Sequence, residues 1–404
     1  MITLPGPTLG VVGGGQLGRM LGEAAAPLGV EVVVSDPTPD CPAAPVVADQ
    51  VVGGFDEYET LRELAERADV LTYEIELTDP DELDRVSEET GTPVHPAPDT
   101  LRTIEDKLVQ KRALADAGIP VPAFRPVADA GELRAAGEEL GWPLTLKARE
   151  GGYDGRGVVF VDGPEDAEAA LDAIGGAAMA EETVDFEREL AVMAVRGDGE
   201  TGALPVTETI HREGILRESV TPARADGATR ERAREVALDV LAELDGRGIF
   251  GIELFERASR SDAERASGER SDPRAGAEIL VNEIAPRPHN SGHWSIEGAV
   301  TSQFALHTRA VLGWPLGSTD LRCPTALANL LGDVDEPREA RLGGVGDVLA
   351  ADGAGLHWYG KREARPLRKM GHVALTADGA GVREPSALLE RVRDLRDRTT
   401  FAPE

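Results

Sequence analysis

The sequence has few cysteines, few lysines and no long apolar run. Its 404 residues contain only two cysteines, Cys41 and Cys323, which is too few for a disulfide framework and fits a protein of the reducing cytoplasm. No stretch approaches ~18 consecutive apolar residues, so we expect no membrane span. No basic-then-apolar segment precedes the first predicted strand, so we also expect no secretory signal.

Positive charge is scarce as well. The formal net charge is −31, which argues against nucleic acid and anionic membranes as partners, since both are polyanions. The chain has 37 arginines but only five lysines, and abundant acidic residues with so little lysine resemble the halophilic proteins of salt-loving organisms. Each lysine is therefore a candidate for a specific role, although we expect Lys111 to be an ordinary surface residue and leave Lys369 open.

Strands and helices alternate through the first hundred residues, which predicts an α/β layer with a parallel sheet. The spacing Gly-x-Gly-x-x-Gly at residues 13–18, with Asp36 closing the second strand, matches the dinucleotide fingerprint. Backbone N–H groups at Gln16 and Leu17 would then meet a phosphate at a helix N-terminus. A monophosphate ligand is favoured over a nicotinamide cofactor, and a turn that needs glycine for packing alone is the third possibility.

Two carboxylates, Glu74 and Glu76, lie near the C-terminal end of a strand predicted at residues 69–76. Open α/β sheets bind ligands at that edge. Alternate positions share one strand face, so the two side chains could together hold ribose hydroxyls or an amine. A solvated strand end is the simpler alternative.

A glycine-rich loop over residues 151–157 follows the predicted strand that carries Lys147. Four glycines in seven residues expose backbone N–H groups that can fold over phosphates. Lys147 can meet a phosphate oxygen as a compact point charge. A helix over about 99–117 carries Lys107 before this unit. A flexible hairpin is the alternative interpretation of the loop.

Acidic residues recur on the strands predicted further along the chain. An apolar strand at 248–256 has one acid, Glu253, in its centre, where a carboxylate is costly unless it is paired or binds a metal. Thr229 is expected to cap a helix that runs to about Leu244. Other polar candidates, on the segments before that helix, are Glu181, Glu182, Glu189 and His211.

The segment 282–294 combines a carboxylate, an amide, an arginine and two histidines. Asn282 and Glu283 end a predicted buried strand, and Glu253 lies on a neighbouring strand, so the two glutamates predict a cage for Mg²⁺. A salt-bridged core acid at Glu253, and a polar strand end with a solvated loop, are the alternatives. Three further side chains of this segment could grip an anion or a carbonyl group: Arg287, His289 and Asn290.

The C-terminal residues predict a smaller β-rich unit with strands near 326–331 and 372–377 and a helix over 386–397, after a helix over about 296–312. Residues 257–276 are polar and charge-mixed, which predicts a disordered insertion between two strands. A basic patch in this acidic protein would focus potential on an anion such as phosphate, with a solvated basic turn as the alternative. The patch comprises Lys361, Arg362, Arg365, Arg368 and Lys369.

Together these motifs resemble the ATP-grasp superfamily and, within it, the family of 5-(carboxyamino)imidazole ribonucleotide synthases. The resemblance implies an α/β protein with an ATP-grasp fold, an N-terminal parallel-sheet domain (pre-ATP-grasp, Rossmann-like) and a small β-rich C-terminal domain. We place the domains at 1–97, 98–313 and 314–404, with a disordered insertion at 258–275. The motifs are GGGQLGRM at 13–20, TYEIE at 72–76, KAREGGYDGRG at 147–157, FGIELF at 250–255, NEIAPRPHNSGHW at 282–294 and HWYGK with a later arginine at 357–368.

The resemblance also implies residue roles. Binding of ATP would involve Lys107, Lys147, Gly152, Tyr153, Asp154, Gly155, Arg156, Gly157, Val158, Glu181, Glu182, Thr183, Val184, Glu189, His211, Asn282 and Glu283. Magnesium would be ligated by Glu253 and Glu283. Aminoimidazole ribonucleotide would be held by Gln16, Leu17, Glu74, Glu76, Lys361 and Arg368. Catalysis would use Asp154, Tyr153, Arg287, His289 and Asn290.

The implied reaction is the ATP- and bicarbonate-dependent carboxylation of 5-aminoimidazole ribonucleotide through carboxyphosphate, in purine biosynthesis. The resemblance implies a homodimer, with small molecules as its other partners. Another ATP-grasp ligase is the nearest alternative, either a formate-dependent glycinamide ribonucleotide transformylase or a biotin carboxylase. The glycine fingerprint keeps an NAD(P)-dependent oxidoreductase open. A non-catalytic ATP-sensing scaffold is disfavoured because both metal carboxylates and the glycine loop are present.

Overall fold

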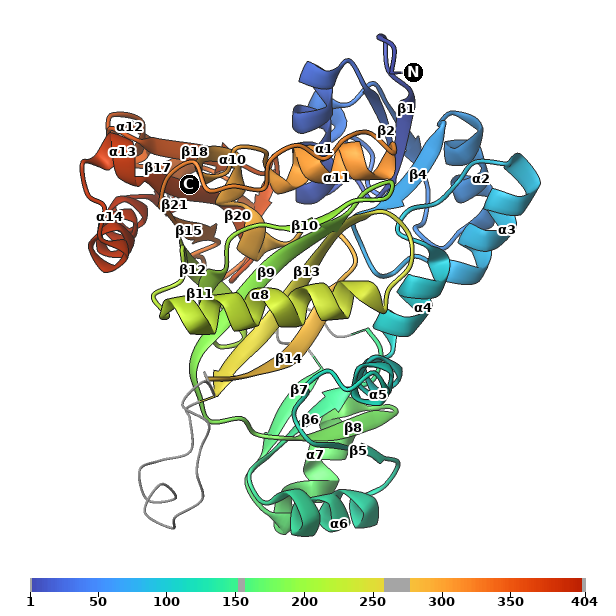
Figure 1. The fold of residues 1–404 in the computed structure, drawn as a ribbon, viewed down its shortest axis with the longest axis vertical. Coiled ribbons are helices and arrows are strands. Elements are labelled where there is room, and N and C mark those ends of the chain that lie inside the picture. The colour runs from blue at the N-terminus through green and yellow to red at the C-terminus, as the bar shows by residue number, and fades with distance from the viewer. Residues whose placement is uncertain (1, 152–156, 258–276, 402–404) are drawn as a thin grey trace.

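The computed structural model describes residues 2–151, 157–257 and 277–401. Its N-terminal unit is a four-stranded parallel sheet in the order β3-β2-β1-β4, which confirms the predicted sheet type (Figure 1). Apolar side chains pack on both faces of this sheet. The elements are β1 (Thr8–Val12), α1 (Gln16–Ala25), β2 (Glu31–Asp36), β3 (Asp49–Val52), α2 (Tyr58–Glu66), β4 (Val70–Tyr73) and α3 (Pro80–Thr90).

Two short helices connect this unit to the rest of the chain. The expected single helix over about 99–117 is wrong, because the structure has α4 (Pro98–Glu105) and α5 (Lys107–Asp116). Asp106 between them has an extended backbone, and its carboxylate accepts hydrogen bonds from the first free N–H groups of α5. Such a cap satisfies the unpaired donors of a helix start, so α5 begins anew after this residue.

A four-stranded antiparallel sheet lies at the lower end of the molecule (Figure 1). Helices α6 (Ala130–Leu140) and α7 (Ala167–Ile174) cover one face with an apolar core. Strand alternation turns Lys147 and Glu181 toward the other face. The strands, in sheet order, are β5 (Phe124–Val127), β8 (Ala178–Glu182), β6 (Leu144–Ala148) and β7 (Val158–Val161).

A nine-stranded sheet forms the centre of the molecule, and α8 (Gly227–Ala242) packs on one of its faces. The expectation that Thr229 caps this helix is wrong. The helix begins two residues earlier, and the Asp226 carboxylate accepts the Thr229 N–H at 2.7 Å. The strands of this sheet before residue 300 are β9 (Phe186–Arg196), β10 (Thr201–Ala203), β11 (Thr207–Arg212), β12 (Ile215–Thr221), β13 (Gly248–Arg257) and β14 (Glu278–Ala285).

The C-terminal strands extend the central sheet instead of forming one of their own. Strand β15 (Thr325–Leu331) pairs with β12, and β20 (Lys369–Thr376) and β18 (Ala354–Trp358) follow it. Helix α14 (Pro385–Asp397) packs against them, so the two predicted strands and the final helix are confirmed. The helix expected over 296–312 is divided into α10 (Ser295–Gly298) and α11 (Gln303–Val311), because Ser302 caps a new start.

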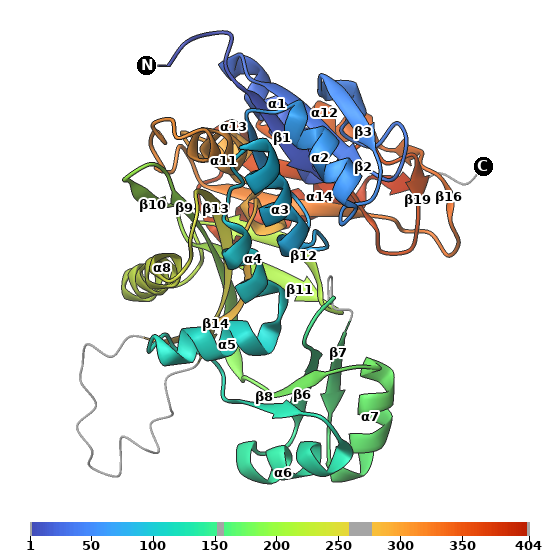
Figure 2. The same ribbon diagram turned by 90° about the vertical axis from the view of Figure 1, so that its right-hand side faces the viewer.

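Short elements complete the described chain. None of the helices in the described residues has both the length and the apolarity needed to cross a bilayer. Seen from the side, α11 lies between the N-terminal sheet and the central sheet (Figure 2). The short elements are β16 (Arg338–Glu339), β17 (Leu342–Gly343), α12 (Val345–Leu349), β19 (Glu363–Ala364), α13 (Ala377–Ala380) and β21 (Thr400–Phe401).

Candidate active site

Two glutamates lie directly opposite each other on β13 and β14. Glu253 pairs with Glu283 in the antiparallel register, and the next pair is Leu254 with Val281. Asn282 is therefore the extra residue of a β-bulge, which re-aims the side chains beside it. Opposite residues of an antiparallel pair have Cα atoms ~4.5–5.5 Å apart, so both carboxylates can reach one cation, as the sequence predicted.

The same sheet face carries a third carboxylate and a histidine. Glu253 pairs with Ala191 of β9, and alternation places Glu189 on that face, where it bonds to His211 Nδ1 at 2.9 Å. Burial lowers the pKa of His211, but the hydrogen bond to Glu189 and the charge of Glu253 outweigh burial and raise it. The pKa of Glu253 is raised, chiefly by burial. The charge of His211 lowers it in part, and the charge of Glu283 raises it further.

Lys107, at the start of α5, forms an ion pair with Glu283. Burial alone lowers the pKa of Lys107, but Glu283 outweighs it and the pKa is raised. Burial alone raises the pKa of Glu283, but Lys107, followed by Lys147, outweighs it and the pKa is lowered. Both groups are therefore charged at neutral pH.

Lys147 and Lys111 share the carboxylate of Glu181. Lys147 Nζ lies 2.6 Å from one oxygen of Glu181 and also donates to Asn282 Oδ1 at 3.0 Å. Lys111 Nζ lies 2.9 Å from the other oxygen. The expectation that Lys111 is a surface residue is wrong: it is 1% exposed, because the two sheets close over it. Glu181, predicted to bind the nucleotide, thus holds two lysines with its side chain.

The loop after β14 brings its polar side chains into contact with distant elements. Arg287 lies 2.8 Å from a carboxylate oxygen of Glu76. His289 is tied through its backbone to Gln303, whose side chain accepts its N–H at 3.0 Å and donates to its C=O at 2.8 Å. Burial, then the charge of Arg287, lowers the pKa of His289 well below its usual range. This imidazole is therefore neutral at physiological pH.

Asn290 is buried and forms two hydrogen bonds with Asn329 of β15. Asn290 Nδ2 donates at 3.2 Å and Asn329 Nδ2 returns a bond of 2.7 Å. Both side-chain groups of Asn290 are thereby engaged within the protein. The structure brings His289 Nε2 to within 3.7 Å of Glu253, whereas Asn290 directs its amide to Asn329 of β15.

The glutamates of the N-terminal unit do not share a strand face as expected. Strand β4 ends at Tyr73, so Glu74 and Glu76 both lie beyond it. Glu74 accepts hydrogen bonds from Gly15 N–H and from Gly18 N–H, the latter at 2.7 Å, while Glu76 turns to Arg287. Burial raises the pKa of Glu74 to about 7, against these hydrogen bonds. Part of the glycine turn is thus occupied by a carboxylate of the chain itself.

Gln16 and the basic patch meet although 345 residues separate them. Lys361 Nζ donates to Gln16 Oε1 at 3.0 Å, beside the N-terminus of α1 and Leu17. Arg368 donates to the Glu363 carbonyl at 3.0 Å and lies in the same C-terminal segment. The geometry therefore joins the predicted phosphate turn to the predicted basic patch, as a site for one phosphate requires.

The remaining predicted residues divide into two groups. Glu182 bonds to Arg257 at 2.6 Å, Thr183 to Thr145 at 3.1 Å, and Val184 is buried. Val158 pairs with Lys147 across β6 and β7, and the Gly157 carbonyl accepts the Ala148 N–H. The predicted residues Gly152, Tyr153, Asp154, Gly155 and Arg156, and the insertion 258–275, lie outside the described residues.

Comparison with known proteins decides which family has this arrangement. Residues 7–105 match the ribonucleotide synthetase preATP-grasp domain, residues 112–304 the ATP-grasp domain, and residues 325–383 the phosphoribosylaminoimidazole carboxylase C-terminal domain. The chain is 39% identical over 373 residues to N5-carboxyaminoimidazole ribonucleotide synthase of Brucella melitensis, which covers 91% of this chain and 96% of that protein. The chain belongs to the N5-carboxyaminoimidazole ribonucleotide synthase family.

Solved members of this synthase family have the same fold over nearly the whole chain. The synthetase of Thermotoga maritima is 39% identical with a TM-score of 0.84, covering 98% of this chain and 100% of that one. The Aspergillus clavatus enzyme, solved with ADP and 5-aminoimidazole ribonucleotide, is 34% identical with a TM-score of 0.84, covering 97% and 99%. The resemblance and the ATP-grasp fold are thus confirmed, and the chain is an ATP-grasp ligase. The domain boundaries stay predictions.

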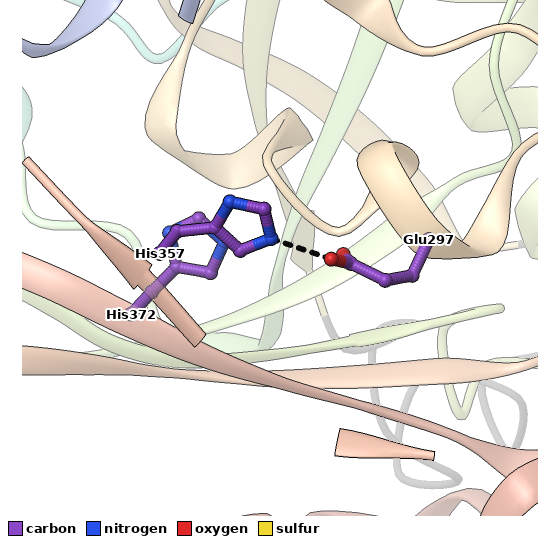
Figure 3. A group of neighbouring side chains, drawn as sticks. All are labelled: Glu297, His357 and His372. Carbon is purple, nitrogen blue, oxygen red and sulfur yellow. Dashed lines mark hydrogen bonds and ion pairs between the residues drawn. The ribbon is translucent and has the colours of Figure 1, made fainter. Parts of the chain in front are cut away.

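A further polar group of this synthase-family chain is formed by side chains of β18, β20 and α10. Ligand atoms of Glu297, His357 and His372 come within 4.8 Å of one another (Figure 3). The two imidazoles stack, with centroids 4.5 Å apart and 16° between their planes. A metal binds histidine through a lone pair in the ring plane, so two such rings cannot both aim at one ion. His357 instead bonds to Glu297, and His372 bonds to the Tyr359 hydroxyl at 2.8 Å.

Sequence reasoning missed three residues that hold the site together. Lys111 was placed on the surface, and no role was given to Gln303 or Asn329. A lysine in a chain that avoids lysine was a usable signal for the first. Gln303 and Asn329 carry no local signal, because their partners, His289 and Asn290, are distant in sequence and become neighbours only when the chain folds.

Proposed function

We propose that this chain carboxylates 5-aminoimidazole ribonucleotide in purine biosynthesis, with ATP as the phosphoryl donor and bicarbonate as the carbon source. Membership of the synthase family supports the ATP-dependent carboxylation. The observation that carries the proposal is the sheet face on which Glu253, Glu283 and Lys147 come together near the Arg287–Glu76 pair. A phosphate chain and a carboxyl acceptor would meet there.

Lys107 and Lys147 are proposed to hold the phosphates of ATP. Both lysines bond to side chains of β14, Lys107 to Glu283 and Lys147 to Asn282, so they lie beside the two candidate metal carboxylates. Phosphoryl transfer depends on positive charge around the transferring group, since its oxygens carry the charge of the transition state. From the sequence, the glycine-rich loop at 151–157 is proposed to cover the phosphates and exclude water, because water would hydrolyse the intermediate.

The acidic face fits a hard divalent cation. Two opposed carboxylates and the amide of Asn282 are oxygen donors of the kind Mg²⁺ accepts. Glu253 lies 3.7 Å from His289 Nε2, and the imidazole of His289 is neutral. A magnesium ion held by Glu253 and Glu283 would supply the charge neutralisation that phosphoryl transfer requires.

The proposed chemistry has three steps. A bicarbonate oxygen attacks the γ-phosphorus, the bond to the bridging oxygen of ADP breaks, and carboxyphosphate forms. It releases phosphate and carbon dioxide, whose carbon is taken up by the exocyclic amine, which loses one proton. Arg287 and neutral His289 would hold the anion by charge-assisted and neutral hydrogen bonds. Asp154, with Tyr153, is proposed from the sequence to orient or deprotonate the amine.

The ribonucleotide is proposed to bind across the junction of the N-terminal and C-terminal units. Lys361, Arg368 and the N-terminus of α1 at Gln16 and Leu17 would take the phosphate, because a helix start and two cations favour an anion there. Glu74 and Glu76 stand between this junction and the acidic face. They would accept hydrogen bonds from the ribose hydroxyls and the amine.

ADP release under different substrate pairs tests the proposal. ATP turnover should rise on addition of 5-aminoimidazole ribonucleotide with bicarbonate and should be unchanged by glycinamide ribonucleotide with formate. Stimulation by the second pair alone would identify a different ATP-grasp ligase. Quenching of tryptophan fluorescence by NADH would support the oxidoreductase alternative. A homodimer, a cytoplasmic location and a halophilic origin stay predictions.

A further inference from the structure

Lys111 is a lysine enclosed between two sheets. It lies on α5, which connects the four-stranded sheet to the β14 edge of the central sheet (Figures 1 and 2). It is 1% exposed, in a chain that has 37 arginines and only five lysines. A buried ammonium group is costly unless its donors are satisfied, so its partners indicate why it is there.

Its two hydrogen-bond partners belong to the two sheets. One donor reaches Glu181 Oε1 of β8 at 2.9 Å, and another reaches the Val281 carbonyl of β14 at 2.8 Å. Strand β14 is the edge of the central sheet, and Val281 directs its N–H outward as well, to the Pro120 carbonyl at 2.8 Å. Asn282 and Glu283 follow directly. Lys111 therefore joins the strand of Glu181 to the strand of the candidate metal ligand.

We infer that Lys111 is a positioning residue for nucleotide binding, which acts through Glu181 on Lys147. This inference rests on the proposed role of Lys147 in holding ATP. One carboxylate oxygen of Glu181 binds Lys111 and the other binds Lys147 at 2.6 Å. Two ammonium groups thus share one negative charge, and the trio retains a net positive charge on the side of Lys147.

The sharing has an electrostatic consequence for the phosphates. Without the Lys111 charge, Glu181 would neutralise Lys147 alone, and that pair would present no net charge to an anion. The carboxylate would also lose the contact that holds one of its oxygens away from Lys147. The charged groups that act on Lys111 itself are Glu181, Lys147 and Glu283, which all belong to the nucleotide face.

The test begins with Lys111→Met and Lys111→Gln. Met removes the charge and the donors, whereas Gln keeps amide donors for Glu181 and the Val281 carbonyl. We expect both to raise KM for ATP and the Kd for ADP about tenfold, the size of one charge-assisted hydrogen bond, with kcat little changed. If the Met variant does not fold, the Gln variant decides. A KM for ATP within about twofold of the parent, which is under one such bond, would overturn the inference.

A double variant separates positioning from packing. Lys111→Met with Glu181→Gln removes the cation and its counter-charge together, and replacing a buried pair by neutral groups is often tolerated. Lys147 is then no longer neutralised, so KM for ATP should return toward the parent value. A KM as high as that of the Lys111→Met single variant would overturn the route through Glu181, because lost packing alone would not be rescued.

Two control variants show whether a rise in KM for ATP is specific to the Lys111–Glu181–Lys147 contacts. Arg396→Met breaks a buried ion pair to Glu218 near α14 and should lower thermal stability without raising KM for ATP. Lys147→Met tests the assumption on which the inference rests, and KM for ATP should rise at least as much as in Lys111→Met. If Lys147→Met leaves KM unchanged, the proposed nucleotide site fails. If it raises KM but the Lys111 variants do not, only the present inference fails.

Discussion

The central sheet holds carboxylates on both of its faces, and the two faces pair them with different cations. Glu218 is 0% exposed and lies among Arg393 at 3.2 Å, Arg212 at 3.8 Å and Arg396. The register from β13 through β9 and β11 to β12 places Glu218 on the face opposite Glu253. On the α14 face the carboxylate is held by arginines, and on the other face Glu283 is held by Lys107. Glu181, on the four-stranded sheet beside that face, is likewise held by lysines.

The difference shows how the chain separates structural from functional charge. The arginine guanidinium has five fixed donors that match a carboxylate, so Glu218 is satisfied within the fold. A lysine is a point charge on a flexible stem, and Lys107 or Lys147 can exchange a glutamate or amide partner for a phosphate oxygen. The chain has 37 arginines and five lysines, and Lys107, Lys111, Lys147 and Lys361 contact candidate site residues.

Replacement of a candidate metal ligand should have the largest effect. Glu283→Gln should keep the fold and lower kcat roughly a thousandfold, because several kcal/mol of charge stabilisation at the phosphoryl group are lost. Thermal unfolding and ADP release measure the two properties. Glu278→Gln, an exposed glutamate on the same strand, is the matched control. A rate near that of the parent would refute the metal assignment.

A substitution on the α14 face of the central sheet should change stability and leave the kinetics unchanged. Arg396→Met removes one of the arginines around Glu218 and should lower the free energy of unfolding by roughly 3 kcal/mol, since a buried charge loses a partner. Urea-induced unfolding measures this change, and steady-state kinetics should show unchanged KM values. A raised KM for ATP in this variant would end the distinction between the two faces.

Substitution of Lys361 tests whether a lysine also binds the second proposed ligand, aminoimidazole ribonucleotide. Lys361→Met should raise KM for aminoimidazole ribonucleotide roughly 30-fold, as expected for a lost ammonium–phosphate contact, and leave KM for ATP unchanged. Arg341→Gln, an exposed arginine paired with Glu339 in the C-terminal region, is the control for loss of positive charge. Equal increases in both KM values would show that Lys361 also acts on the binding of ATP.

Within the part of the chain that the structure describes, Glu74 is a buried carboxylate with no arginine or lysine bonded to it, and its effect should appear only as a dependence of stability on pH. Burial raises its pKa from 4.5 to about 7, with Arg287 and Asp36 as the charged groups acting on it. A raised carboxyl pKa adds stability below pH 4.5 that is lost as pH rises through 7. The stability of the parent should therefore fall by about 2–3 kcal/mol between pH 5 and 8 relative to Glu74→Gln. Parallel urea-unfolding profiles over this range would contradict the assignment.

Much of the fold could be predicted because it depends on local patterns. Alternation of strands and helices predicted the parallel N-terminal sheet, and the C-terminal strands and last helix were placed within a few residues. Boundaries failed where one polar side chain decides them. Asp106, Asp226 and Ser302 each cap a helix start, and a cap competes locally with continuation of the helix.

The sequence by itself determined which residues could share a strand face, because side-chain direction alternates along any strand. It therefore predicted that Glu253 and Glu283 could meet, and the register places them opposite each other. Only the tertiary structure decided that Lys111 is enclosed with Glu181, that Glu74 fills the glycine turn and that Lys361 reaches Gln16. These contacts join residues far apart in the chain, so they follow from how the sheets pack and not from local spacing.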